Sequence, residues 1–224
     1  MKIICYRAVF RPEGDTDYDK LYPPENPDPD TTFAAFTNNE DDWWTTREGW
    51  RMYPAALIYK GDLRLQARMH KCLPHSMFPD ADWTLWVDGS LTPKTPPSEL
   101  VERHKGFDIT TFDRIARDCA YDEGILMANK KRDDPDKILE QCSRYLAEGY
   151  PAHNGLCATT AVLRKNTPQM REFGQRWWEE IANGCNRDQV SINYVLWKMG
   201  IPWGKFRGRW NNSPDFTWRP HYGR

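Results

Sequence analysis

The sequence lacks the cysteine spacing of a disulfide framework or a zinc finger. Its 224 residues include six cysteines, but these lie far apart, with no CxxC pair and no cysteine–histidine cluster at zinc spacing. No apolar run approaches the length of a membrane span, and the run at residues 2–10 is broken by Arg7 and is too short for a signal sequence. We therefore expect a soluble, cytoplasmic protein with reduced thiols and no membrane span.

An excess of charge is also absent. The chain has 31 basic and 32 acidic residues and a formal net charge of −1, so no overall field favours nucleic acid or an anionic membrane. Glycine-rich phosphate loops of the GxxxxGK[ST] or GxGxxG kind do not occur either. Their absence argues against P-loop and dehydrogenase classes.

The most informative stretch that is present is a strand that ends in polar residues. The apolar run Trp83–Val87 is followed at once by Asp88, Gly89 and Ser90. Such a run is typical of a buried strand in an α/β sheet, and these sheets bind ligands at the carboxyl ends of their strands. Asp88 could hold a metal-bound phosphate there, with Ser90 as a second oxygen. The alternative is an ordinary Asp-Gly turn.

Strand and helix patterns alternate along the rest of the chain, which predicts one α/β domain. The pattern shows no internal repeat and no linker. The predicted strands cover residues 2–10, 31–37, 49–53, 83–87, 107–112 and 156–163, and the predicted helices cover residues 62–76, 98–104, 118–131, 136–148, 168–182 and 188–199.

The predicted helix over residues 62–76 carries four basic side chains on one face. Arg64, Arg68, Lys71 and His75 are spaced by four, three and four residues, so they project in one direction. They could contact the oxygens of a nucleotide diphosphate held near the following strand. A solvated helix face is the alternative interpretation.

Three further groups are candidates for chemistry. In the triplet Arg187, Asp188 and Gln189, Asp188 is either a helix N-cap or a carboxylate that orients or deprotonates an acceptor hydroxyl. The pair Asp122-Glu123 is either catalytic or a favourable acidic first turn. His221 could supply a metal ligand if the C-terminal segment folds back.

The last 22 residues, 203–224, have no strong period but interleave basic and aromatic side chains. We interpret this segment as a tail, a lid or a binding surface. Because aromatic side chains can stack on bases while basic ones contact phosphates, one alternative is a surface that binds DNA.

Taken in order, several motifs resemble a glycosyltransferase-like family first catalogued as a domain of unknown function and found in bacterial polysaccharide loci and plant Golgi proteins. Each motif is weak alone, but their order and spacing are fairly specific. The matching motifs are FTNN (36–39), RLQARMHKCLPHSMF (64–78), WTLWVDGS (83–90), RDCAYDEG (117–124), QCSRYLAEGYP (141–151) and RDQVSINYVLWKMG (187–200).

The resemblance implies a fold similar to GT-A glycosyltransferases, a single Rossmann-type α/β domain with a mixed, mostly parallel sheet flanked by helices. The family's Asp-x-Asp metal motif falls on Asp88, Gly89 and Ser90, so a serine replaces the second carboxylate. The resemblance then implies Mn²⁺ or Mg²⁺ held by Asp88 and Ser90, with His221 as a further ligand. Donor-base contacts would fall on Thr37, Asn38 and Asn39.

The function implied is transfer of a sugar from a nucleotide-diphosphate donor to a hydroxyl of a glycan, a small molecule or DNA. Asp188, in its triplet, would be the general base if the reaction inverts configuration, or would steady the acceptor if it retains configuration. Two alternatives stay open at this point: a transferase that acts on modified bases of DNA, and a non-catalytic sugar- or nucleic-acid-binding module on a decayed transferase fold.

Overall fold

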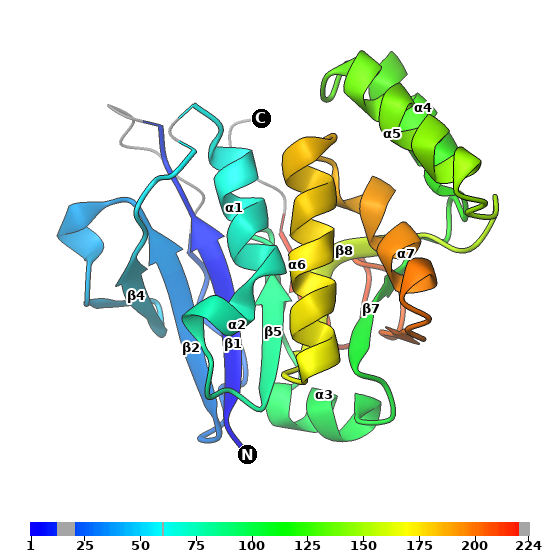
Figure 1. Ribbon diagram of the computed structural model, residues 1–224. Coiled ribbons are helices and arrows are strands. Elements are labelled where there is room, and N and C mark those ends of the chain that lie inside the picture. Colours follow the sequence, from blue (N-terminus) through cyan, green and yellow to red (C-terminus); the bar gives the residue numbers. More distant parts are fainter. Residues whose placement is uncertain (13–20, 60, 220–224) are drawn as a thin grey trace.

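The computed structural model describes residues 1–12, 21–59 and 61–219, and its centre is a mixed eight-stranded sheet (Figure 1). Four of the strand pairings are parallel and three are antiparallel. This confirms the predicted α/β class with a mixed, mostly parallel sheet. The strands, in spatial order, are β3 (Thr46–Arg47), β4 (Trp50–Pro54), β2 (Thr31–Thr37), β1 (Ile3–Val9), β5 (Trp83–Val87), β8 (Cys157–Lys165), β7 (Ile109–Asp113) and β9 (Gly204–Lys205).

Helices cover both faces of this sheet, and the alternation of side chains along β1 shows why. Ile4 and Tyr6 point into one buried cluster, whereas Ile3 and Cys5 point into the other. In Figure 1, α1 and α6 cross the front of the sheet, α4 and α5 form a pair beyond α7, and α3 lies at the lower edge. The helices are α1 (Leu63–Cys72), α2 (Pro74–Met77), α3 (Pro97–His104), α4 (Ala120–Asn129), α5 (Pro135–Ala147), α6 (Pro168–Asn183) and α7 (Asp188–Lys198).

The predicted helix over residues 62–76 is in fact two helices. Asp62 caps α1 by accepting a hydrogen bond from the Leu65 amide, as its sequence pattern predicts. The helix stops at Leu73, whose φ of −113° and ψ of 47° are not helical. Pro74 explains the break, because a residue before proline avoids the α conformation and proline has no N–H to donate. His75 therefore belongs to the next helix, α2, and not to the face of α1 that carries Arg68.

The described part of the C-terminal segment, residues 203–219, packs into the fold. β9 extends the main sheet beside β7, and β10 (Phe216–Trp218) pairs antiparallel with β6 (Leu91–Pro93). Phe206 and Phe216 are each 3% exposed and belong to the core. In the described residues, this segment is thus an ordered part of the domain.

The six cysteines are all buried and free, consistent with the predicted absence of disulfides. None of the helices in the described part of the chain is long and apolar enough to cross a membrane.

One edge of the sheet gathers the chain's informative motifs. The parallel strands β1, β2 and β5 end at this edge, and the antiparallel strand β8 begins there, since Val87 pairs with Ala161. The Asp88 amide donates to the Thr160 carbonyl at 2.8 Å. The first turn of α7 joins them, because Asp188 accepts a hydrogen bond from Thr159 of β8.

Candidate functional site

Asp88 stands at the carboxyl end of β5, as the sequence predicts, and its side chain is 28% exposed. The backbone turns sharply after it, with the Leu91 amide donating to the Asp88 carbonyl at 2.9 Å. The Trp86 indole Nε1 donates to Asp88 Oδ1 at 2.7 Å. The sequence left open whether Asp88 belongs to an ordinary turn or presents its carboxylate at the end of the strand. The structure has both features at this residue.

Lys71 contacts two of the acidic residues that the sequence singles out, Asp88 and Asp188. Its ammonium lies 2.6 Å from Asp188 Oδ2 and 3.3 Å from Asp88 Oδ1, and its side chain is fully buried. The backbone of Lys71 is also fixed, because its carbonyl accepts hydrogen bonds from Arg164 of β8 and from the Tyr6 hydroxyl. The end of α1 thus delivers a buried cation to the edge of the sheet.

Asp188 is the first residue of α7, and its side chain is 4% exposed. The N-cap position belongs to Arg187. The Asp188 carboxylate instead accepts hydrogen bonds from Lys71 and from Thr159 Oγ1 at 2.7 Å, and it forms an ion pair with Arg68 at 3.2 Å. Burial alone would raise the pKa of this carboxyl, but Arg68, Lys71 and the hydrogen bonds hold its pKa well below the ordinary value. Asp188 is an anchored anion, and the N-cap interpretation is wrong.

Positive charge accumulates around this centre. Burial and the nearby Arg187 and Arg68 lower the pKa of Arg64, and burial lowers the pKa of Arg114 with a further contribution from Arg187. Nε of Arg68 and Nε of Arg114 are buried without a hydrogen-bond partner in the described residues. Like charges held together with unused donors are suited to an anionic ligand such as a diphosphate.

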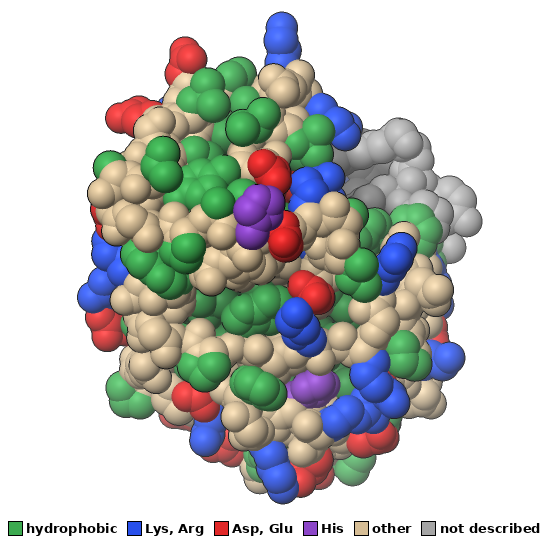
Figure 2. Space-filling model, turned by 90° about the vertical axis from the view of Figure 1, so that its right-hand side faces the viewer, with side chains coloured by type: hydrophobic (Ala, Val, Ile, Leu, Met, Phe, Trp, Pro, Cys, Tyr) green, Lys and Arg blue, Asp and Glu red, His purple; other side chains and the backbone are tan. Residues whose placement is uncertain are grey.

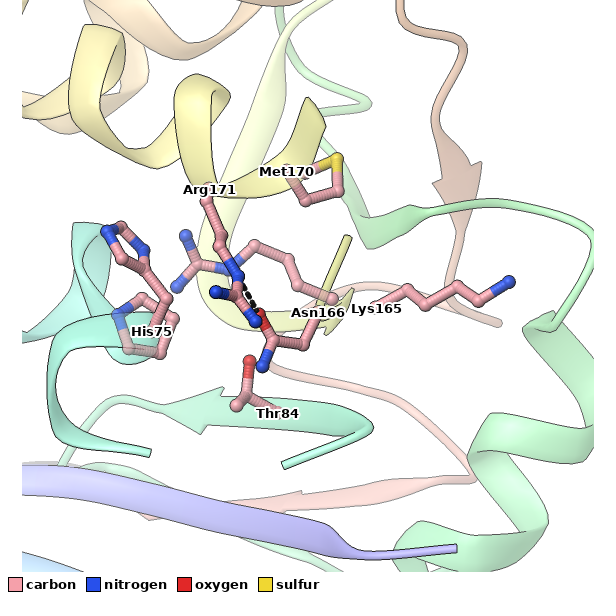
Figure 3. Close-up of a pocket in the computed structure, with 8 residues that line it drawn as sticks. His75, Thr84, Lys165, Asn166, Met170 and Arg171 are labelled. Atoms are coloured by element: carbon pink, nitrogen blue, oxygen red, sulfur yellow. Dashed lines mark hydrogen bonds between the residues drawn. The ribbon is translucent and has the colours of Figure 1, made fainter. Parts of the chain in front are cut away.

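Other residues with a predicted role lie apart from this centre or make different contacts. His75 lines a small pocket with Thr84, Arg164 and Arg171, at the far end of β8 (Figure 3). In that pocket Arg171 Nε donates to Asn166 Oδ1 at 2.9 Å. Arg164 lines this pocket and also fixes the end of α1. Because the pocket lies at the other end of β8, His75 lies apart from the centre formed by Lys71, Asp88 and Asp188.

The predicted donor-base residues lie on the site's edge, at the end of β2, but their polar groups are engaged locally. Asn38 exchanges two hydrogen bonds with the backbone of Arg11, at 2.8 and 3.0 Å. The Thr37 hydroxyl accepts from the Asn39 amide at 3.1 Å. These residues border the site, but their contacts do not indicate which nucleotide base the site would bind.

The remaining predicted residues have separate outcomes. Ser90 is 9% exposed, and its carbonyl accepts from the Arg219 amide at 2.8 Å. Gln189 is half-buried in the first turn of α7. His221 lies outside the described residues. Glu123 of the pair with Asp122 is 2% exposed and accepts from Arg117 at 2.6 Å, so it serves an internal ion pair.

A divalent metal would find one carboxylate ligand at Asp88. In the described residues no hydrogen bond or ion pair engages Asp88 Oδ2, and no group of three or more acidic, histidine or cysteine ligands includes Asp88. A Mg²⁺- or Mn²⁺-type ion bound through one carboxylate and completed by substrate phosphates and water fits this donor set. A site built from protein ligands alone does not fit the described residues.

Two contacting residues escaped the sequence analysis. Trp86 lies two positions before Asp88, so the period of a strand puts both side chains on one face, and this signal could have identified it. Thr159 carries no local signal, because its partner Asp188 lies 29 residues further along the chain.

The fold and this centre define an α/β protein with a buried cation between two carboxylates at the ligand-binding edge of its sheet. Residues 35–208 match the family model described as TOD1/MUCI70, glycosyltransferase-like domain. Because the match covers well over half of the chain and includes Lys71, Asp88 and Asp188, the protein belongs to this glycosyltransferase-like family.

A curated relative is the probable hexosyltransferase MUCI70 of Arabidopsis thaliana, 27% identical over 162 residues. The aligned part is 67% of this chain and 28% of that protein, so the chain spans little more than a quarter of its relative's length.

Two solved structures are similar to the chain. One is a glycosyltransferase involved in the glycosylation of the major capsid of PBCV-1, with a TM-score of 0.40 and 11% identity over 70% of this chain and 66% of that one. The other is mouse xyloside xylosyltransferase 1 in its apo form, with a TM-score of 0.48 and 9% identity over 92% of this chain and 84% of that one.

Proposed function

We propose that this protein is a nucleotide-sugar-dependent glycosyltransferase whose donor diphosphate binds at the edge of the sheet beside Asp88. The observation that carries the proposal is the convergence of Lys71 and Arg68 on Asp188, next to a partly exposed Asp88. The family supports the transfer of a sugar, and the surplus of cations at this edge supports a donor that carries a diphosphate.

The reaction makes one bond and breaks another at the anomeric carbon of the sugar. The acceptor hydroxyl oxygen forms the new bond to that carbon, and the bond from carbon to the diphosphate oxygen breaks with its electron pair going to the diphosphate. The hydroxyl proton passes to the departing diphosphate or to water. Lys71, Arg68 and Arg187 stabilise the negative charge that develops on the leaving group.

A divalent cation is part of the proposal, with Asp88 as its carboxylate ligand. Such an ion would neutralise charge on the diphosphate when it is bound. The Ser90 side chain and His221 remain predicted ligands, and Ser90 is close enough in sequence to contribute its hydroxyl beside Gly89.

Asp188 fits the role of an electrostatic anchor better than that of a general base. A general base is most effective when its pKa lies near the working pH, and the neighbouring cations hold the pKa of Asp188 far below that range. Its carboxylate keeps Lys71 and Arg68 oriented and places negative charge near the sugar carbon, where positive charge develops.

The basic-aromatic C-terminal segment does not favour DNA as the acceptor in its described part. Lys205 pairs with Asp113, and Arg219 pairs with Glu25. Arg207 lies 2.5 Å from Asp215. Because these cations are matched by carboxylates within the protein, a glycan or small-molecule hydroxyl is the acceptor class that we propose.

Calorimetry with UDP, GDP and their sugar conjugates in the presence of Mn²⁺ or Mg²⁺ tests the donor site. Binding of one nucleotide is expected, together with weaker binding in Arg68→Gln and Asp88→Asn. Asp82→Asn is the matched control, since Asp82 precedes the other end of β5 and its carboxylate accepts a hydrogen bond only from the Lys2 amide in the described residues. Arg176→Gln, an exposed change on α6, controls for loss of an arginine.

Two results would overturn the parts of the proposal separately. If no nucleotide binds, the donor class is wrong. If a nucleotide binds equally well without a divalent ion and in Asp88→Asn, then the proposal of a metal ion at Asp88 is wrong, whereas the proposal of a donor site at this edge is retained. Release of free sugar or a transferred product from a bound donor, followed by mass spectrometry, distinguishes an enzyme from a binding module.

A further inference from the structure

A second group of potential metal ligands lies outside the Asp88–Asp188 centre. One ligand atom from each of Cys119, Asp122 and His153 lies within 4.8 Å of the other two, and no other such group of three occurs in the part of the chain that the structure describes. Cys119 precedes α4 after the end of β7, Asp122 is in the first turn of α4, and His153 lies in the segment before β8. Two separate segments of the chain, the start of α4 and the segment before β8, are thus brought together.

The thiol of Cys119 lies at the buried side of the cluster. Cys119 is the N-cap residue of α4 but makes no side-chain cap hydrogen bond. Its residue is 2% exposed, and a cysteine binds metals through its sulfur. The sulfur is therefore held at the inner side of the cluster, where its exchange with solvent is restricted.

His153 carries the hydrogen bond that orients metal-binding histidines. Its Nδ1 lies 2.8 Å from Asp118 Oδ1, and both side chains are about two-thirds exposed, at 65% and 67%. When Nδ1 donates to a carboxylate, the lone pair stays on Nε2, as in the carboxylate–histidine–metal arrangement of zinc proteins. Figure 2 shows the side of the molecule where α4, α5 and α7 lie, and on it a histidine sits at the surface beside acidic side chains.

We propose that Cys119, Asp122 and Nε2 of His153 bind a zinc ion, with Asp118 orienting the histidine and one coordination position open to solvent. Thiolate, imidazole and carboxylate together suit Zn²⁺, whereas Mg²⁺ and Mn²⁺ prefer oxygen ligands. The ion joins the segment that leaves β7 to the segment that enters β8. The end of β7 pairs with the start of β8 through Asp113 and Cys157. The proposed zinc ion therefore lies at the same edge of the sheet as the donor site, and it is separate from the ion proposed at Asp88.

Cobalt substitution tests this site directly. The 224-residue protein is stripped with a chelator and titrated with Co²⁺, and then Zn²⁺ is added in competition. We expect one equivalent per chain, a thiolate-to-cobalt charge-transfer band, and loss of that band on adding zinc. His153→Gln and Asp122→Asn, both exposed changes that spare the core, are expected to weaken binding by tenfold or more, and Asp118→Asn by about 10–100-fold.

The thiol is assigned by two cysteine variants. Cys119→Ser is expected to abolish the charge-transfer band, while the control Cys142→Ser, at another buried cysteine, keeps it. An absent band in the wild-type protein, or a band and stoichiometry that persist unchanged in His153→Gln, would overturn the proposal. Circular dichroism of each variant shows whether the domain is still folded.

Discussion

The buried ammonium of Lys71 makes the sharpest prediction about this protein. Replacing it with methionine preserves much of its volume but leaves Asp188, at 4% exposure, with Arg68 as its remaining charged partner. Removing one partner of a buried ion pair typically costs about 3–5 kcal/mol, because the other charge is left uncompensated. For a chain of this length, that loss corresponds to a fall in the melting temperature of about 6–20 °C.

Urea and thermal unfolding at pH 7, followed by circular dichroism, measure this loss. The double variant Lys71→Met/Asp188→Asn removes both charges of the pair, so its loss of stability should be smaller than the sum of the two single losses by about 1–3 kcal/mol. Lys105→Met is the control, because Lys105 is 65% exposed and pairs with an exposed Glu102. A Lys71→Met variant as stable as this control, or strictly additive single variants, would refute a central role for the buried pair.

Three further predictions follow from other parts of the structure. Hydrogen bonds from arginines and a threonine outweigh burial and lower the pKa of Asp215 to about 2. The contribution of Asp215 to stability is therefore present above the unfolded pKa of about 3.9 and is lost as the pH falls toward 2. The free energy of unfolding, measured in urea between pH 2 and 5, should depend less steeply on pH in Asp215→Asn than in the wild-type protein. Gly174→Ala should destabilise the protein by about 1–3 kcal/mol, because an added Cβ would lie 2.4 Å from a backbone carbonyl oxygen of α1. The control is Gly106→Ala, where an added Cβ would meet no atom within 4 Å, and it should leave the midpoint of urea unfolding nearly unchanged. Trp86→Phe keeps a ring in the core but removes the hydrogen bond to Asp88, and calorimetry should show weaker nucleotide binding without a comparable loss of stability.

The centre of the sheet could be predicted from sequence because its signals are local. A continuous apolar run identifies β5, and the residue that follows it is Asp88. Asp62 marks the start of α1 because the capping interaction spans only three residues. The class of fold and the position of the acidic residue at the sheet edge follow from such signals.

Other features depend on contacts that no local pattern records. The strands β9 and β10 have two and three residues, too few to show a period of two. Pro74 is a signal for the helix break at Leu73. The regular spacing of the basic residues continues past this proline, however, and therefore favoured a single helix over residues 62–76. The contact of Lys71 with Asp188 spans 117 positions and exists only because α1 and α7 reach the same edge of the sheet.

The centre formed by Lys71, Asp88 and Asp188 holds its side chains in fixed positions and still has hydrogen-bonding groups that no residue in the described part of the chain uses. An ammonium has three donors, and Lys71 uses two of them on Asp188 and Asp88. Asp88 keeps Oδ2 available, and Arg68 keeps a buried Nε–H without a partner in the described residues. In the function that we propose, a diphosphate would contact the cations directly and Asp88 through a divalent ion, while Asp188 continues to hold Lys71 and Arg68 in place. Because the charges are positioned before the ligand arrives, little reorganisation is needed when negative charge develops on the leaving group, and this is the condition under which electrostatic catalysis is most effective.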